Sequence, residues 1–455
     1  MKGIFRRGIA VIAAVALTAA IAGCSGDGGK EGTGQEKTVE RATENTSGKT
    51  TENSSDKTTD KSAAGEVKLP EIKVTNPTLR VLTHDGLVTT QAEKLLKSEY
   101  GITEIKVDLV PPAEKRTKLM NAVMANDSYD IYWDDFAPGL IMGGYVQTID
   151  VDIQSPLWSP LADSVQQFMW NGQRFYLVPG FARQSMVYYN KSMLDEAGEE
   201  YPTDLFDQGK WDWNKLYDMA KALTVDSNKD GTPEQYGLGF DEPEHILYTT
   251  GKHFVSFMPD GTAKNNIQSP ETARAVAFNV KLLKSGTMVP SNARQSFGEG
   301  SVAMCIGHRW YAYGYAKLIK AGDLGLAPLP RDPDADKYYT AEEGGGFYIP
   351  KGAPNIEGAR AAANVFRFVC SDPSYIKENY MHAIKNRLWT EELQKEYEKS
   401  ESIEAGVLRN WEAFGLVDYW GDIFTRPVQG EPWETISAEL APKIDASIKE
   451  LYEAK

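Results

Sequence analysis

The chain has 455 residues, of which 41% are hydrophobic, so it is long enough for two or three domains with sizeable cores. Its formal net charge is −15, and loss of Lys2, Arg6 and Arg7 with a leader would make it −18 (−15 − 3). This acidic balance argues against attraction to phosphate backbones, so no nucleic-acid partner is expected.

The first 23 residues have the pattern of an export leader. Three basic residues precede an apolar run, Gly8 to Ala22, that is too short to span a membrane comfortably. The run closes with Ile21-Ala22-Gly23-Cys24, which matches a bacterial lipobox and predicts cleavage before Cys24 and diacylation of its thiol. Because two acyl chains anchor a protein stably, we expect an extracytoplasmic protein held to the bacterial cell membrane. An ordinary cleaved signal with an incidental cysteine is the alternative.

Residues 24–75 are predicted to form a disordered tether. The part from Ser25 to Gly65 has no aromatic residue and almost no aliphatic side chain, so it cannot bury enough apolar surface to offset the entropy of ordering.

Only Cys305 and Cys370 remain besides Cys24, and both lie in apolar sequence. This favours buried, inert thiols, with a disulfide between the two cysteines as the alternative for an exported protein.

Strands and helices alternate from Leu79 onward. Leu79–Thr83, Ile105–Leu109 and Tyr129–Trp133 are predicted strands, and apolar residues at helical spacing follow the first two. The alternation predicts an α/β fold with mostly parallel sheets flanked by helices. Ligands of such folds bind beyond the carboxyl ends of the strands. The candidate ligand-binding residues at these ends are His84, Asp85, Trp133, Asp134 and Asp135.

A central stretch rich in aromatic residues admits two interpretations. Two β-prone runs, Arg174 to Val178 and Ser185 to Tyr189, flank a Pro179-Gly180 break, and Asn190 is placed to cap the next helix. The runs form either a hairpin within one core or a passage of the chain between two bodies. In the second case Arg183 and Gln184 would lie beside a ligand.

Further along the chain, helices are predicted at residues 211–223, 272–283, 359–370 and 435–452. An apolar strand, Val302 to Ile306, precedes three candidate ligand-binding residues, namely Arg309, Trp310 and Tyr311. An acidic loop offers oxygen ligands at calcium-loop spacing, from Asp226, Asn228, Asp230, Thr232 and Glu234. Gly237 stands where such a loop needs a bidentate Glu, so the loop either binds a structural Ca2+ with help from elsewhere or is a turn that holds no ion.

These landmarks, taken in order, resemble the extracellular solute-binding proteins of carbohydrate ABC importers, the maltose-binding-like family 1. The resemblance covers Leu79 to about Leu451. It rests on Tyr129-Asp130-Ile131, Pro179 through Tyr189-Asn190-Lys191, Ala197-Gly198, Trp211, Phe297 through Met304 with Trp310, Leu329-Pro330, and Gly345 through Gly352.

The resemblance implies a two-lobed periplasmic-binding-protein-like fold with a ligand cleft between the lobes. Each lobe would be a mostly parallel sheet flanked by helices. Lobe one would comprise residues 76–181 and 345–398, and lobe two residues 182–344 and 399–455. The first crossing between lobes then falls within Gly180 to Ser185, and the second near Glu343-Gly344-Gly345. The position of the third crossing, around residues 385–410, is not indicated by any pattern.

The aromatic, acidic and arginine candidates are all side-chain types that bind sugars. Aromatic rings stack on the apolar faces of sugars, which makes Trp310, Trp411 and Trp420 candidates, with core packing as the alternative. The acidic pairs Asp134-Asp135 and Glu342-Glu343 would accept hydrogen bonds from sugar hydroxyls, or are solvated charges. As a glycosidase pair they would need carboxyl groups about 5–10 Å apart. Arg183 and Arg309 would suit an acidic sugar.

The resemblance therefore implies a lipid-anchored, monomeric receptor that binds an oligosaccharide and delivers it to the transmembrane subunits of an ABC permease, with no required cofactor and no catalysis. Sequence motifs of common hydrolases, nucleotide-binding loops and metalloproteases do not occur. Two alternatives stay open. One is a membrane-anchored glycoside-processing enzyme, and the other is the same fold serving as the sensor subunit of a membrane kinase.

Overall fold

The computed structural model describes residues 67–84, 88–180, 182–183, 185–258, 262–343, 345–372, 390–403, 405–408 and 416–453. The chain divides into residues 1–62 and 63–455, and every described residue belongs to the second unit. The predicted leader, Cys24 and most of the predicted tether lie outside the described residues. The end of the tether is described, and there the prediction is wrong. Leu69, Ile72 and Val74 pack against a hydrophobic core, and the Tyr100 hydroxyl donates to the Pro70 carbonyl over 2.8 Å.

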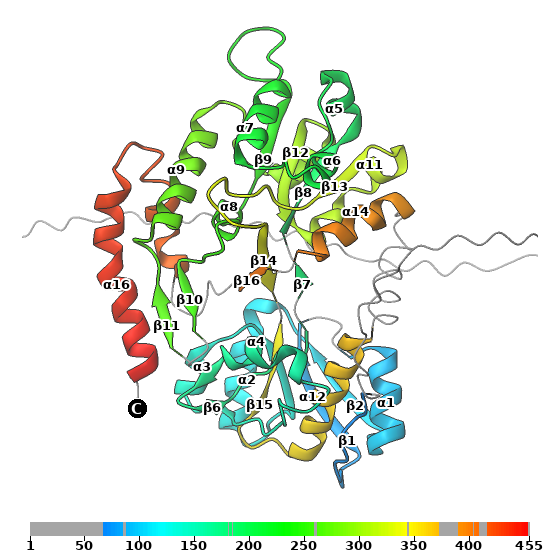
Figure 1. Cartoon of the computed structure of the whole chain (residues 1–455). Coiled ribbons are helices and arrows are strands. Elements are labelled where there is room, and N and C mark those ends of the chain that lie inside the picture. The colour runs from blue at the N-terminus through cyan, green and yellow to red at the C-terminus, as the bar shows by residue number, and fades with distance from the viewer. Residues whose placement is uncertain are drawn as a thin grey trace, which may run out of the picture. The chain divides into compact units, whose positions relative to one another are not determined.

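The first sheet has five strands in the order β2-β1-β3-β15-β4 (Figure 1). Strand β1 is parallel to β2 and β3, whereas β15 returns antiparallel to β3 and β4. The strands are β1 Thr78–Thr83, β2 Glu104–Leu109, β3 Ile131–Asp134, β4 Val146–Gln147 and β15 Gly346–Pro350. The surrounding elements are α1 Thr90–Tyr100, α2 Pro112–Met124, α3 Pro138–Met142, η1 Ser159–Leu161, α4 Ala162–Gln166, β5 Met169–Trp170, β6 Gln173–Arg174 and α12 Ile356–Ser371.

Helix α1 shows how the local sequence sets its bounds. The Thr89 side chain accepts a hydrogen bond from the Ala92 amide at the start, and Gly101 ends the helix in the left-handed conformation (φ 67°). Its buried face, which includes Ala92 and Leu96, packs with α12 against the first sheet. The alternating strands and helices predicted for residues 79–133 are confirmed.

The second sheet has four strands in the order β13-β8-β12-β9. Strand β12 is parallel to β9 and antiparallel to β8, which is also antiparallel to β13. The strands are β8 Ser185–Asn190, β9 Tyr236–Phe240, β12 Val302–His308 and β13 Leu324–Ala327. The surrounding elements are α5 Lys191–Ala197, α6 Pro202–Asp207, α7 Trp213–Ala222, α8 Glu244–Tyr248, the β10 Val255–Phe257 and β11 Ala263–Asn265 hairpin, α9 Pro270–Lys284, α10 Ala293–Glu299, η2 Arg309–Gly314, α11 Ala316–Ala321 and α14 Glu391–Glu401.

The two β-prone runs of the central stretch belong to different parts of the fold, so the hairpin interpretation is wrong. In the first run Leu177 bridges Phe347 beside the first sheet, whereas the second run is β8 of the second sheet. Every residue of β8 is buried, because it lies between β12 and β13. Tyr188 and Tyr189 pack into different core clusters on the two faces of the sheet, and neither reaches the surface.

A small third sheet of three strands, in the order β16-β14-β7, forms where the chain passes between the two larger sheets (Figure 1). Strand β7 (Ala182–Arg183) connects the first sheet region to β8, and β14 (Tyr339–Glu343) leads back from β13 to β15. Strand β16 (Ala405–Leu408) is parallel to β14, and β7 is antiparallel to it. The C-terminal elements are η3 Leu416–Tyr419, α15 Trp420–Phe424 and α16 Trp433–Glu453.

Helix α14 differs from the prediction that residues 345–398 belong to lobe one. It packs on β13 of the second sheet, where its Glu396 carboxylate accepts hydrogen bonds from the Leu326 amide (2.9 Å) and the Tyr189 hydroxyl (3.1 Å). The connection from α12 to α14 therefore runs through residues 373–389, outside the described residues.

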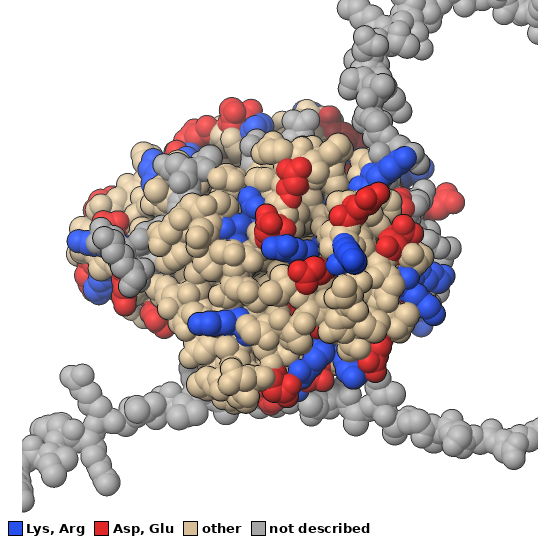
Figure 2. Space-filling view, turned by 90° about the horizontal axis from the view of Figure 1, so that it is seen from below, with Lys and Arg blue, Asp and Glu red and all other residues tan. Residues whose placement is uncertain are grey.

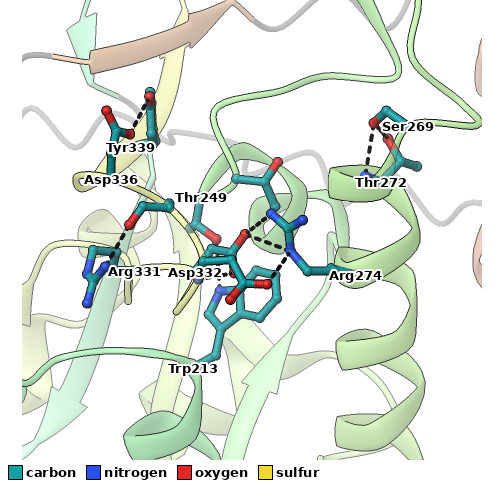
Figure 3. A network of polar contacts seen from close by, with 12 residues as sticks. Trp213, Thr249, Ser269, Thr272, Arg274, Arg331, Asp332, Asp336 and Tyr339 are labelled. Carbon is teal, nitrogen blue, oxygen red and sulfur yellow. Dashed lines mark hydrogen bonds and ion pairs between the residues drawn. The ribbon is translucent and has the colours of Figure 1, made fainter.

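Buried polar contacts fix the helices of the second sheet. Arg274 of α9 pairs with the buried Asp332, with 2.7 Å between guanidinium nitrogen and carboxylate oxygen (Figure 3). In the same network the indole of Trp213 on α7 donates to the Thr249 hydroxyl over 2.9 Å.

On the face of the molecule seen from below, basic and acidic side chains lie beside one another (Figure 2).

Candidate functional site

The carboxyl ends of parallel strands carry charged and aromatic side chains in both larger sheets. In the first sheet β1 is followed by His84, and β3 ends at Asp134. In the second sheet β9 is followed by Asp241 and Glu242, and β12 ends at His308. Because ligands of open α/β sheets bind at these ends, the two sets of residues form the candidate site.

Asp134 is the centre of an ion-pair network in the first sheet. Its buried carboxylate lies 2.6 Å from Lys115 Nζ and 2.7 Å from Arg116 Nε, and it accepts from the Tyr132 hydroxyl over 2.6 Å. Burial raises the pKa of Asp134, but the Arg116 and Lys115 cations outweigh it and hold the pKa below its ordinary value. The Lys115 ammonium also contacts His84 Nδ1 at 3.2 Å.

Asp134 is fully buried beneath these cations. Its side chain has no exposed surface and pairs with Lys115 and Arg116, whose orientation it helps to fix. Direct ligand contact by Asp134 stays a prediction. Arg116, whose side chain is 38% exposed, presents the charge of this network to solvent. Neither cation was predicted from the sequence. Lys115 and Arg116 lie in the first turns of α2, which follows β2 of the same sheet, and this position would have placed them near the strand ends.

The other candidates in the first sheet have mixed environments. Asp135 is exposed and His84 is half-buried. Trp133 is half-buried in β3, and its ring covers Gly345 so closely that a Cβ atom there would lie 2.6 Å from the indole. Packing thus occupies part of the Trp133 ring. Asp85 lies outside the described residues.

The candidates after β12 divide between surface and core. Trp310 is 43% exposed, stacks on the His308 ring at 5.8 Å between centroids and carries the Arg294 guanidinium 4.5 Å from its centre. Tyr311 is only 3% exposed and packs over Gly307, so its ligand contact stays a prediction. Arg309 is half-buried, and its carbonyl accepts from the Tyr188 hydroxyl over 2.9 Å.

Among the remaining candidates, Arg183, Glu342 and Glu343 belong to strands β7 and β14 of the third sheet. Glu342 of β14 is half-buried, and its backbone pairs with Arg183 of β7. Trp420 of α15 is half-buried and packs against Phe424, with ring centroids 4.7 Å apart. The side chains of Arg183 and Glu343, and all of Gln184 and Trp411, lie outside the described residues. Direct ligand contact by these residues stays a prediction.

The acidic loop has a tight backbone. The Asp226, Asn228 and Asp230 side chains accept hydrogen bonds from the loop amides of Gly231, Asp230 and Thr232, at 2.7–3.0 Å. The second carboxylate oxygen of Asp226 is buried without a hydrogen-bond partner. Glu234 accepts from the Ser227 amide over 2.8 Å, and calcium binding by this loop stays a prediction.

Three residues that the sequence analysis did not select meet at the end of the second sheet. Glu242, His245 of α8 and His308 place ligand-type atoms within 4.8 Å of one another. Their position at the carboxyl ends of β9 and β12 was a signal that strand order alone could have supplied.

Cys305 and Cys370 are both free thiols, so no disulfide joins them.

A cavity of about 590 Å³ lies elsewhere, lined by residues that include Pro156, Leu157, Arg367 and Phe368. None of the candidate ligand-binding residues lines it. Among the described helices, none combines the length and hydropathy needed to cross a lipid bilayer.

Solved structures of binding proteins have the same fold. The sugar-binding protein MalE from the phytopathogen Xanthomonas citri superposes with a TM-score of 0.61 at 16% identity, covering 82% of this chain and 98% of that chain. A cyclo/maltodextrin-binding protein complexed with maltotetraose gives 0.58 at 18% identity, covering 82% and 97%. The GacH receptor of Streptomyces glaucescens, solved unliganded and with acarbose, gives 0.54 at 19% identity, covering 83% and 98%.

These similarities establish a two-lobed α/β binding-protein fold, in which the first and second sheets are the cores of the two lobes. The family model of bacterial extracellular solute-binding proteins matches residues 91–386, which is more than half of the chain. The chain therefore belongs to the bacterial extracellular solute-binding protein family, with the fold of the maltose-binding-like receptors.

Proposed function

We propose that the protein is a lipid-anchored receptor that binds an oligosaccharide between its two lobes and delivers it, as a monomer and without chemical change, to an ABC permease. The main support is that charged and aromatic side chains gather at the carboxyl ends of strands in two separate sheets. Arg116 is partly exposed at the first sheet, and Trp310 is exposed at the second. Family membership and the sugar ligands of similar structures support it.

The arrangement suits a binding mechanism based on a shift in population. The lobes are connected through short strands, and glycine near a connection absorbs backbone rotation at little steric cost. A ligand that contacts both strand-end sites favours the closed arrangement, because it interacts more strongly with that state. Charged donors such as Arg116 would bind sugar hydroxyls, and the indole of Trp310 would cover an apolar sugar face.

A thermal-shift screen of the full chain against neutral and acidic oligosaccharides tests this proposal. At least one class of glycan should raise the melting temperature, since a ligand at 100 times its Kd stabilises the folded state by about 2.7 kcal/mol. No shift with any glycan would contradict it. The same mixtures are analysed for new reducing ends, because turnover would favour a glycoside-processing enzyme.

The lipid anchor has a separate test. In cells that produce the protein, Cys24→Ser should move it from the membrane fraction to the soluble fraction, since the thiol that would carry the diacylglycerol is removed. Retention of the variant in the membrane fraction would contradict anchoring through Cys24.

A further inference from the structure

The end of the second sheet brings two imidazoles and one carboxylate together. Glu242 lies in the loop after β9, His245 lies one helical turn later on α8, and His308 is the last residue of β12. Because β9 and β12 are parallel, with Phe240 opposite Ile306, their carboxyl ends meet at one edge of the sheet. Among the described residues, these three place potential metal-ligand atoms within 4.8 Å of one another, and no other set of three or more His, Cys, Asp or Glu residues does so.

The distances in this group fit a metal ion after small side-chain movements. His308 Nε2 and a carboxylate oxygen of Glu242 are 2.8 Å apart, and the two imidazole rings are 5.0 Å apart between centroids. A tetrahedral ion with bonds of about 2.1 Å separates its ligand atoms by about 3.4 Å. This separation between ligand atoms lies between the 2.8 Å contact of His308 with Glu242 and the 4.8 Å within which all three ligand atoms lie.

The surroundings of the group support and orient its ligands. His245 and His308 are 1% and 2% exposed, whereas the Glu242 side chain is 23% exposed and leaves one side accessible. The Ser185 hydroxyl lies 2.8 Å from His245 Nδ1, which fixes the ring orientation and directs the lone pair to Nε2 when Nδ1 carries the proton. The Trp310 indole stacks on the His308 ring.

The hydrogen bonds of the His308 ring are incomplete. Its Nδ1 atom is buried and has no hydrogen-bond partner, although buried polar atoms in proteins are generally satisfied. A hydrogen bond between Glu242 and Nε2 alone leaves this imidazole half satisfied. A cation bound at Nε2 would replace this hydrogen bond and compensate the Glu242 carboxylate, while Nδ1 would keep its present surroundings.

We propose that Glu242, His245 and His308 bind a Zn2+ ion. Two imidazole nitrogens and one carboxylate oxygen are a ligand set that Zn2+ prefers over Ca2+ and Mg2+, which favour all-oxygen sites. Three protein ligands leave a fourth position for water or an oxygen of a bound solute. The proposal does not depend on the identity of the transported solute.

Isothermal titration of the full chain with zinc chloride tests the site. The protein carries no polyhistidine tag and is first treated with EDTA and dialysed into metal-free buffer. We expect one ion per chain. Glu242→Gln and His245→Gln should each weaken zinc binding at least 100-fold, and Ser185→Ala about 10- to 100-fold, as second-shell changes do.

His253→Gln is the matched control. His253 is a buried histidine that stacks on Tyr248 of the same region but lies outside the group, so this variant should bind zinc like the wild type. Cobalt(II) provides a second measurement, since the wild type should show the visible absorption of a tetrahedral complex and Glu242→Gln should not. Failure of the wild type to bind zinc, or equal zinc affinity of the wild type and Glu242→Gln, would overturn the proposal.

Discussion

Replacement of Trp310 by alanine is expected to weaken oligosaccharide binding strongly while the protein stays folded. Trp310 is 43% exposed, and because a tryptophan buries up to about 250 Å², roughly 110 Å² of its surface is available to a ligand. At about 25 cal/mol per Å², full coverage would contribute about 2.7 kcal/mol, or nearly 100-fold in Kd. A sugar that covers only one face would give about half this free energy, or roughly 10-fold.

The assay is a calorimetric titration of wild type and variants with the glycan that gives the largest thermal shift. Trp310→Phe, which keeps an aromatic face, should retain most of the affinity. Leu283→Ala on α9, at a side chain that is 38% exposed, is a control for the loss of a surface hydrophobic group. If Trp310→Ala instead binds with unchanged affinity, or loses stability far beyond Leu283→Ala, the indole belongs to the packing of the lobe and not to the ligand site.

Three further predictions concern stability. Asp134→Asn should lower the free energy of unfolding by about 3–5 kcal/mol in urea denaturation, because it leaves the buried Lys115 cation without its counter-charge; a loss below about 1 kcal/mol would show that the ion pair is dispensable. The folded pKa of Asp134 is held below its unfolded value, so its stabilising contribution is present at neutral pH and is lost as the pH falls through the folded pKa. Wild type should therefore lose more stability than Asp134→Asn in acid, and parallel pH profiles would refute this. Finally, calcium chloride should raise the melting temperature and Asp226→Asn should abolish the rise, whereas equal melting temperatures in calcium and EGTA would identify the loop as a plain turn.

Local sequence signals predicted the elements and the order of the fold well. Asn190 caps α5 by accepting from the Met193 amide, as its position after a strand suggested, and the strands predicted at 79–83 and 105–109 are β1 and β2. These features depend only on neighbouring residues. The division of the central stretch between two sheets depended instead on the order of motifs along the whole chain, because its own residues fit a hairpin equally well.

Contacts between distant segments account for the features that were not predicted. The sequence places Asp134 at a strand end, but its burial results from Lys115 and Arg116 on a helix of another segment. Likewise, α14 packs on β13, where Glu396 accepts a hydrogen bond from the Leu326 amide, a residue 70 positions earlier in the chain. Spacing within one segment carries no information about such partners.

Recovery of the bound molecule tests whether the protein binds an intact carbohydrate. The full chain is incubated with a mixture of neutral and acidic oligosaccharides, washed and denatured, and the released compounds are identified and quantified by mass spectrometry. We expect about one unmodified oligosaccharide per chain. Release of cleaved products, or retention of no glycan from the mixture, would contradict it.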